Sequence, residues 1–439
     1  MKRGLGGLTL AFAVFCVVCG GPFGLEAVVS EVGAGMALVL ILLTPIVWAI
    51  PDALTTAELA AAIPEEGGYV VWVRRAMGSF AAFLNAWWSW LYTLVDAALY
   101  PGMFVTYLAA LLQSNGFPFL ADHPWAKYAT CLVVIALFTW LNLRGTKVVG
   151  LASSAFTLII VLPFVALAGY GAWRVTQGQG TLPIIRFEGG GNGLAVGLAI
   201  VMWNYLGWDA LSTVAEEVDR PEKAYPRALA IGVPLVTAAY FLPTYIGLAF
   251  FPDAAQWKEG AWPAIATAVG GKGLGLLVNF AGLVSPLALF TATLLGSSRV
   301  PFVLAEDGFL PKWLLDIHPK YGTPWRCILL CGVIYAALVW QSFKTLVALN
   351  VVLYGTALVL ELLALVILRF KEPELPRPFR VPGGWVGLGL VFLLPTMLVG
   401  LLAYQSLVEE GLAAQGPTIA VLISAPVIYL FARRLKAER

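Results

Sequence analysis

Three carboxylates lie deep inside apolar stretches of this sequence: Glu26, Asp96 and Asp209. A charged side chain in the hydrocarbon of a bilayer is unfavourable by roughly 3 kcal/mol or more, and such residues are usually functional. A structural acid normally has a resident lysine or arginine, yet every basic residue here falls in a loop or at the end of an apolar stretch, with Arg299 nearest to an exception. The sequence therefore reveals no permanent cation for these acids.

Three arrangements accommodate such acids. They are protonated, they line a water-filled cavity, or a cation reaches them from outside. Alternation among these states is what a proton-coupled cation transporter requires. For any single acid, a neutral carboxyl group that hydrogen-bonds to a neighbouring helix is the alternative. Asp52, Glu58 and Glu361 also fall within apolar stretches, and we expect them nearer the inner side of the membrane.

The composition places these acids in membrane-spanning helices. Of 439 residues, 60% are hydrophobic and 12% are charged, with a mean hydropathy of +0.85, whereas soluble domains average about 25% charged residues. In lipid each segment must satisfy its own backbone, which predicts helices. The first stretch resembles a signal peptide, but similar stretches recur, so we interpret it as a retained span. About twelve stretches are long enough to cross a bilayer, and they centre near residues 20, 48, 92, 134, 160, 205, 240, 289, 334, 358, 393 and 423.

The placement of basic residues predicts the orientation of the helices. If the loops alternate, 21 of the 27 Lys and Arg residues share the side of the N-terminus. Cytoplasmic loops carry the excess of Lys and Arg, so we expect both termini in the cytoplasm and a multi-pass protein of the plasma (inner) membrane. The net charge of +2 gives no reason to expect a nucleic-acid partner.

The first predicted span contains residues that interrupt a helix, namely Gly20, Gly21, Pro22 and Gly24. Glycine in a helix interior is unfavourable by about 1 kcal/mol and proline by about 3 kcal/mol. We predict that the helix unwinds here for a few residues. A close crossing of two helices at small residues is the alternative.

A weaker interruption lies in the sixth span, where Asn204 and Gly207 occupy the centre. Broken helices five spans apart are typical of inverted repeats that hold a substrate between them. Each break is followed by an acid, Glu26 or Asp209, near the start of the resumed half-helix. That end carries partial positive charge and would hold a substrate carboxylate. A resident acid there favours a substrate rich in ammonium groups over a simple zwitterion.

Aromatic residues surround both breaks. Phe23, Trp203 and Trp208 flank them, and we interpret these residues as a gate or cage, because ammonium groups bind ring faces with about 0.5–2 kcal/mol each. Packing is the preferred interpretation of the cluster that precedes Asp96, since Trp and Tyr also anchor spans at interfaces. That cluster comprises Trp87, Trp88 and Trp90, and Tyr92 is a further aromatic residue of the same region.

Other classes of function have little support. The five cysteines lie in apolar stretches and the two histidines in loops, without metal-ligand spacing. A membrane enzyme needs clustered catalytic groups at one membrane face, and a channel needs a polar stripe or a repeated filter. We expect no enzyme activity, no metal and no cofactor.

Five stretches, in this order, carry a family resemblance: GGPFGLE, IPDALTTAELAAAIPEEGGYVVWV, DAALYP, WDALSTVAEEV and KEPELPRPFRVPGG. Over nearly its full length the chain resembles the amino acid–polyamine–organocation (APC) permeases, and within them the plant-type polyamine uptake transporters and their prokaryotic relatives. The resemblance implies an all-α integral membrane fold of the sodium-coupled leucine transporter type. It implies one domain, 1–439, built from two inverted five-helix repeats and two additional helices, at residues 5–175, 191–371 and 385–434.

The resemblance also implies alternating access around a midplane site among spans one, three, six, eight and ten. The unwound segments and the three acids carry over by motif onto this sequence. Together with the flanking aromatic residues they form the expected substrate-binding set: Gly20, Gly21, Phe23, Gly24, Glu26, Asp96, Trp203, Asn204, Tyr205, Gly207, Trp208 and Asp209.

The leading hypothesis is a secondary active transporter that imports a small cationic amine or amino acid, with a polyamine favoured, by proton-coupled symport. Some proton-coupled relatives have a fifth-span lysine in place of sodium, but this chain has none, so Glu26, Asp96 and Asp209 are the coupling candidates. Ser297 and Ser298 match an eighth-span motif near the ion site of sodium-dependent relatives. Sodium-coupled amino acid uptake is therefore one alternative, and exchange of amines or amino acids is the other.

Overall fold

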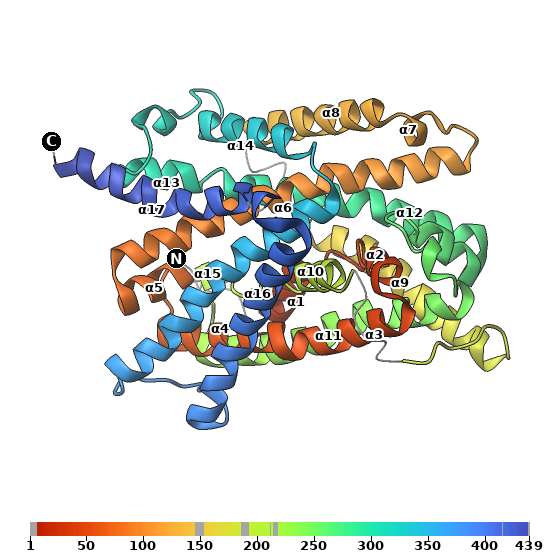
Figure 1. Cartoon of the computed structure of the whole chain (residues 1–439), viewed down its shortest axis with the longest axis horizontal. Helices are drawn as coiled ribbons and strands as arrows, with labels where there is room; N and C mark the ends of the chain where they lie inside the picture. The colour runs from red at the N-terminus through yellow and green to blue at the C-terminus, as the bar shows by residue number, and fades with distance from the viewer. Residues whose placement is uncertain are drawn as a thin grey trace.

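Helices make up every regular element of the computed structural model, which describes residues 7–144, 153–185, 193–210, 212–213, 218–414 and 416–437 (Figure 1). The starts of the two expected repeats, at residues 5 and 191, lie outside this described part. The N-terminal half contains α1 (Gly7–Val18), α2 (Glu26–Val32), α3 (Ala34–Thr44), a π-helical turn (Pro45–Ala49), α4 (Ile50–Ala62), α5 (Tyr69–Met77), α6 (Ser79–Ser114), α7 (Phe119–Asp122), α8 (Pro124–Leu143), α9 (Ser153–Thr176) and α10 (Leu194–Asn204). The remainder contains α11 (Pro221–Phe250), α12 (Trp262–Ser297), α13 (Val300–Glu306), α14 (Trp325–Leu338), α15 (Phe343–Lys371), α16 (Gly384–Ala414) and α17 (Gly416–Ala437), with short 3₁₀ turns at Ala254–Gln256 and Lys312–Leu315.

Nine helical segments in the described residues are long and apolar enough to cross a membrane. Nine of the twelve predicted centres fall within them. The other three, near residues 20, 205 and 334, fall at the two predicted breaks and in α14, a shorter apolar helix of 14 residues. The chain is thus an all-helical, multi-pass integral membrane protein, and the full count of twelve spans stays a prediction.

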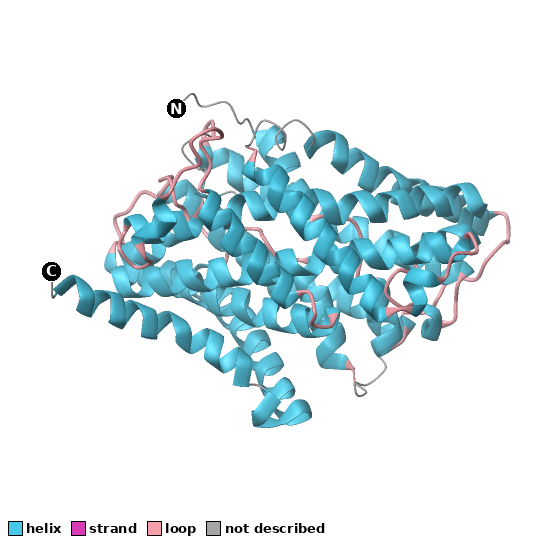
Figure 2. Ribbon diagram, turned by 90° about the horizontal axis from the view of Figure 1, so that it is seen from above, coloured by secondary structure: helices cyan, strands magenta, loops and turns pink. Residues whose placement is uncertain are grey.

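The helices divide into a buried centre and a peripheral pair. α6 packs against α12 and α15, while α1 packs against α11 (Figure 1). In the most apolar 18-residue window of each helix, 61% of the residues are buried in α15, 22% in α16 and only 11% in α17. α17 accordingly lies along the margin of the molecule in the view of Figure 2. The core that positions a site therefore consists of the helices before α16.

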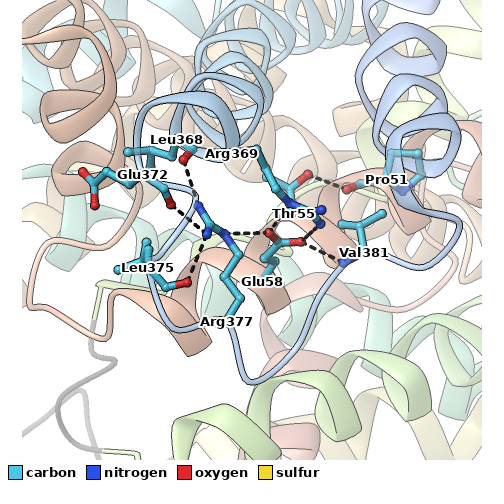
Figure 3. A network of polar contacts seen from close by, with 9 residues as sticks. All are labelled: Pro51, Thr55, Glu58, Leu368, Arg369, Glu372, Leu375, Arg377 and Val381. Carbon is cyan, nitrogen blue, oxygen red and sulfur yellow. Dashed lines mark hydrogen bonds and ion pairs between the residues drawn. The ribbon is translucent and has the colours of Figure 1, made fainter.

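One buried carboxylate, Glu58 on α4, fixes the loop that joins α15 to α16 (Figure 3). It accepts two hydrogen bonds from Arg369 and one, of 2.7 Å, from the backbone N–H of Val381. The Nε of Arg377 lies 3.3 Å from its Oε1. Arg377 also donates to three backbone carbonyl groups of the same region, those of Leu368, Glu372 and Leu375. Glu58 thus has resident cations, which come from the end of α15 and from the loop.

Replacement of Glu58 by glutamine should destabilise the protein strongly. Removing one partner of a buried ion pair typically destabilises by about 3–5 kcal/mol, because the other charge stays buried and unpaired. Thermal unfolding of the purified chain measures this. Glu372→Gln is the matched control, since the side chains of its pair with Arg75 are 31% and 36% exposed, against 0% for Glu58, and solvent-accessible pairs contribute little. Equal melting temperatures for the two variants would contradict the structural role of Glu58.

Candidate functional site

The first predicted break is present. α1 ends at Val18 and α2 begins at Glu26, with no helix through Pro22. Gly21 and Gly24 have φ angles of 89° and 90°, a region that favours glycine because it lacks a Cβ. The unwinding therefore follows from the glycines and the proline, as the sequence predicts.

Side chains from other helices bind the backbone groups that the break frees. The Ser285 hydroxyl donates to the Gly20 carbonyl at 2.6 Å, and the Trp262 indole N–H donates to the Pro22 carbonyl at 2.8 Å. Both side chains belong to α12. Because unpaired carbonyl groups in lipid are unfavourable by several kcal/mol, α12 stabilises the unwound backbone.

Glu26 is the first residue of α2, directly after the break, and is buried. Its Oε2 accepts from the Gly24 N–H at 2.7 Å, its Oε1 accepts from the Gly260 N–H at 2.9 Å, and the Tyr107 hydroxyl also donates to it. Glu26 therefore fastens the segment that precedes α12 onto the first break. In this arrangement the protein itself supplies three hydrogen bonds to Glu26.

The second break begins where α10 ends, at Asn204. Gly207 has a φ of 94°, which again requires glycine. The Tyr240 hydroxyl on α11 lies 3.0 Å from the Asn204 carbonyl oxygen and 3.1 Å from that of Val18. A single tyrosine thus stands between the last carbonyl groups of both broken helices.

Asp209 follows the second break and meets an acid that the site prediction omitted. The Tyr354 hydroxyl oxygen lies 2.9 Å from Asp209 Oδ1 and 2.6 Å from Asp52 Oδ2. It also accepts from the Gly207 N–H at 3.3 Å. A hydroxyl group donates one proton and ionised carboxylates only accept, so both contacts can be full hydrogen bonds when Asp52 or Asp209 carries a proton.

Glu361 is a further buried acid near Asp52 and Asp209. It lies two helical turns beyond Tyr354 on α15 and accepts a 3.1 Å hydrogen bond from the Asn85 amide. Tyr92 of α6 packs edge-on against Tyr354, with ring centroids 5.0 Å apart. The sequence predicts Asp52 and Glu361 nearer the inner side of the membrane and does not group Asp52 with Asp209. The tertiary structure places both Asp52 and Asp209 against the Tyr354 hydroxyl.

Asp96 holds an aromatic residue at the first break. Its Oδ1 accepts from the Trp203 indole N–H at 2.8 Å, and the Tyr100 hydroxyl donates to its Oδ2. The Trp203 ring packs edge-on against Phe343 at 5.6 Å. A Cβ atom added at Gly24 would lie 3.0 Å from the Phe343 ring and 3.1 Å from the Trp203 ring. Asp96, Trp203 and Phe343 therefore border the first break, whereas Asp209 lies with Asp52.

The other predicted residues are placed as follows. Phe23 packs edge-on against Tyr107 and Phe164, with centroids 5.1 Å apart in both pairs. Tyr205 donates to the Ile41 carbonyl at 3.0 Å, and Trp208 is buried. Trp87, Trp88 and Trp90 donate to Ser424, Leu422 and Ser297, which agrees with packing.

The possible sodium residues have partners of their own. The Ser297 hydroxyl lies 2.6 Å from the Tyr335 hydroxyl. Ser298 Oγ accepts a 2.8 Å hydrogen bond from the Arg299 guanidinium. A guanidinium so close repels a second cation, which disfavours sodium at Ser298.

No ion pair among the described residues involves Glu26, Asp96 or Asp209. Helices that break inside a membrane, beside buried acids without a resident cation, are typical of solute transporters. Comparison with known proteins agrees. The family model for amino acid permeases matches residues 5–428, and the chain belongs to this family.

The relatives narrow the class of solute. Polyamine transporter RMV1 of Arabidopsis thaliana is 34% identical over 422 residues, which cover 96% of this chain and 84% of the relative. Polyamine transporter PUT1 of Oryza sativa subsp. japonica is 34% identical over 436 residues, which cover 96% and 77%. The branched-chain amino acid permease BcaP of Bacillus subtilis is 25% identical, with 99% and 94% covered. The chain is a membrane transporter for amines or amino acids, not an enzyme.

A side chain at Gly24 should damage the first break. Gly24→Ala combines an unfavourable φ with contacts of 3.0–3.1 Å to two rings, and strain of this kind is on the order of 1–3 kcal/mol. We expect a lower melting temperature of the purified protein. Gly389→Ala on α16 is the control, because nothing lies within 4 Å of its added Cβ. The assignment is wrong if Gly24→Ala unfolds at the wild-type temperature.

Proposed function

We propose that this protein imports a small organic cation, a polyamine in preference to an amino acid, by proton-coupled symport with alternating access. The observation that carries the proposal is the pair of hydrogen bonds at Tyr354. Two buried acids, Asp52 and Asp209, share one hydroxyl group, and a proton on either acid would complete both hydrogen bonds. Loss of that proton would leave a buried negative charge that a substrate ammonium group or a new proton can neutralise.

Proton and substrate movement would be coupled because a proton and a substrate ammonium group can each neutralise the same carboxylate. A buried carboxylate without a counterion is strongly unfavourable. An ammonium group that enters stabilises the ionised acid, and its release restores the need for a proton. Proton and substrate would then alternate at Asp209 as the protein changes conformation. Asp96 and Glu26 border the first break and remain candidates for further contacts with the substrate.

Similarity to transporters named for polyamines supports the choice of substrate class. Similarity to a transporter named for branched-chain amino acids keeps exchange or sodium-coupled uptake of amino acids as the alternative. The two breaks, each followed by an acid, support the division into inverted repeats at 5–175 and 191–371 with two further helices at 385–434. The basic residues near Glu58 support a cytoplasmic location for the ends of the helices around Glu58 and for both termini.

Uptake of radiolabelled putrescine into proteoliposomes tests the mechanism. An inward proton gradient should stimulate uptake by the wild-type protein. Tyr354→Phe should lose this stimulation but retain putrescine–putrescine exchange, because it removes the hydroxyl group that links Asp52 to Asp209 and leaves both carboxylates in place. Tyr170→Phe, an exposed tyrosine on α9, should behave as wild type. Uptake that ignores the gradient would refute proton coupling, and uptake that requires internal substrate would indicate an exchanger.

Replacement of Asp209 by asparagine should distinguish substrate binding from structure. The amide has nearly the same shape but lacks the charge that an ammonium group needs. Uptake of putrescine should fall at least tenfold, and uptake of a neutral amino acid should fall much less. Asp122→Asn, at an exposed position of α7, serves as the control. Equal loss for both solutes would mean that Asp209 has a structural or purely coupling role.

A further inference from the structure

Two exposed basic side chains flank the end of α8, those of Arg144 and Lys320. Arg144 directly follows the last residue of α8, and Lys320 belongs to the loop that leads into α14. The Thr323 hydroxyl of this loop donates a 2.9 Å hydrogen bond to the Leu143 carbonyl of α8. The two basic residues therefore lie on two segments that this bond holds together.

The loop that carries Lys320 has a fixed backbone. His318 Nδ1 accepts hydrogen bonds from the backbone N–H groups of Lys320 and Tyr321, at 3.2 and 3.3 Å. Backbone hydrogen bonds of 2.9 and 2.8 Å join His318 to Gly322 and Thr323. Because Thr323 is also bonded to α8, the turn sets the place of Lys320 relative to the end of that helix.

An aromatic ring orients Arg144. Its guanidinium carbon lies 3.7 Å from the centre of the Trp140 ring. A guanidinium group that stacks by its face keeps N–H donors at its edges, which suit a phosphate group. Arg326, at the start of α14, already pairs with Asp316 at 2.5 Å. Among the residues that the structure describes, neither Arg144 nor Lys320 forms an ion pair.

A line of exposed apolar side chains leads from Arg144 along α8. Trp140, Leu137 and Val133 follow at spacings of four, three and four residues, so they share one face of the helix. These three side chains are 45%, 48% and 65% exposed. α8 lies along one margin of the molecule in the view of Figure 1. The described part of the chain leaves this face uncovered, and in a membrane protein such a face contacts lipid.

We propose that the end of α8 binds an anionic phospholipid of the surrounding bilayer. Its phosphate binds the Arg144 guanidinium, Lys320 adds positive charge nearby, and an acyl chain follows the apolar line of α8. Basic residues at the end of an apolar helix attract anionic head groups. A soluble anion would leave the apolar line unused, and phosphatidylcholine would bring a second positive group to Arg144. The inference concerns bilayer lipid and does not depend on the proposed substrate or coupling ion.

Arg227 on α11 provides a matched comparison. It is exposed, and Ile231 and Leu235, four and eight residues further along α11, are 50% and 48% exposed. Within the described ranges, Arg227 forms no ion pair and stacks on no aromatic ring. Arg227 therefore has a charge and an apolar face but lacks the ring that orients Arg144.

Native mass spectrometry of the purified full-length protein, titrated with lipid, tests the site. Dioleoyl phosphatidylglycerol and dioleoyl phosphatidylcholine have the same acyl chains and differ in the net charge of the head group. We expect the wild-type protein to bind the first molecule of phosphatidylglycerol at least fivefold more tightly. Arg144→Gln should remove most of this preference. Trp140→Leu should reduce it at least twofold, because leucine keeps an apolar surface but cannot orient the guanidinium group.

Two controls separate a built site from a general attraction of positive charge. Arg227→Gln should keep the wild-type preference, and millimolar glycerol phosphate, the soluble part of the head group, should not displace the bound lipid. The proposal is overturned if the two lipids bind equally, or if Arg144→Gln or Trp140→Leu keeps the full preference. It is equally overturned if Arg227→Gln loses as much preference as Arg144→Gln, or if glycerol phosphate displaces the lipid, which would indicate a site for soluble anions.

Discussion

The hydroxyl group of Tyr354, held between Asp52 and Asp209, is the contact on which the proposed chemistry depends. It joins α4, α15 and the second helix break in one hydrogen-bonded unit, in which a proton on either acid would complete both contacts. A buried carboxylate elsewhere in the protein shows the contrast. Glu58 has the guanidinium groups of Arg369 and Arg377 as permanent partners, and so acts as a fixed structural charge. The acids near the breaks have no such partner among the described residues.

The broken helices are stable because neighbouring helices supply hydrogen bonds to the freed backbone. α12 contributes Ser285 and Trp262 to the first break, and Tyr240 of α11 lies between the ends of α1 and α10. A conformational change that separates these helices must replace such bonds with others, since hydrocarbon offers none. The breaks and their partners are therefore expected to move as units.

Around Asp209 the described acids are in excess, and none of them has an ion pair. The proposed substrate, a small organic cation, would supply the missing positive charge.

The sequence by itself determined the features that depend on local chemistry. Composition and the length of apolar runs are sufficient to predict spanning helices. Glycine and proline at 20–24 are sufficient to predict the first break, because their backbone preferences act where they occur. The spans centred near residues 20 and 205 do not form single long helices for the same reason.

Only the tertiary structure decided which distant side chains meet. Asp52, Asp209 and Tyr354 are separated by more than a hundred residues at each step, and no local pattern encodes their contact. Tyr240 and Trp262 likewise look like ordinary aromatic residues of apolar helices until packing brings them to the breaks. The physical reason is that a hydrogen bond depends on the relative rotation and depth of packed helices, whereas a helix or its interruption depends on the residues of one short segment.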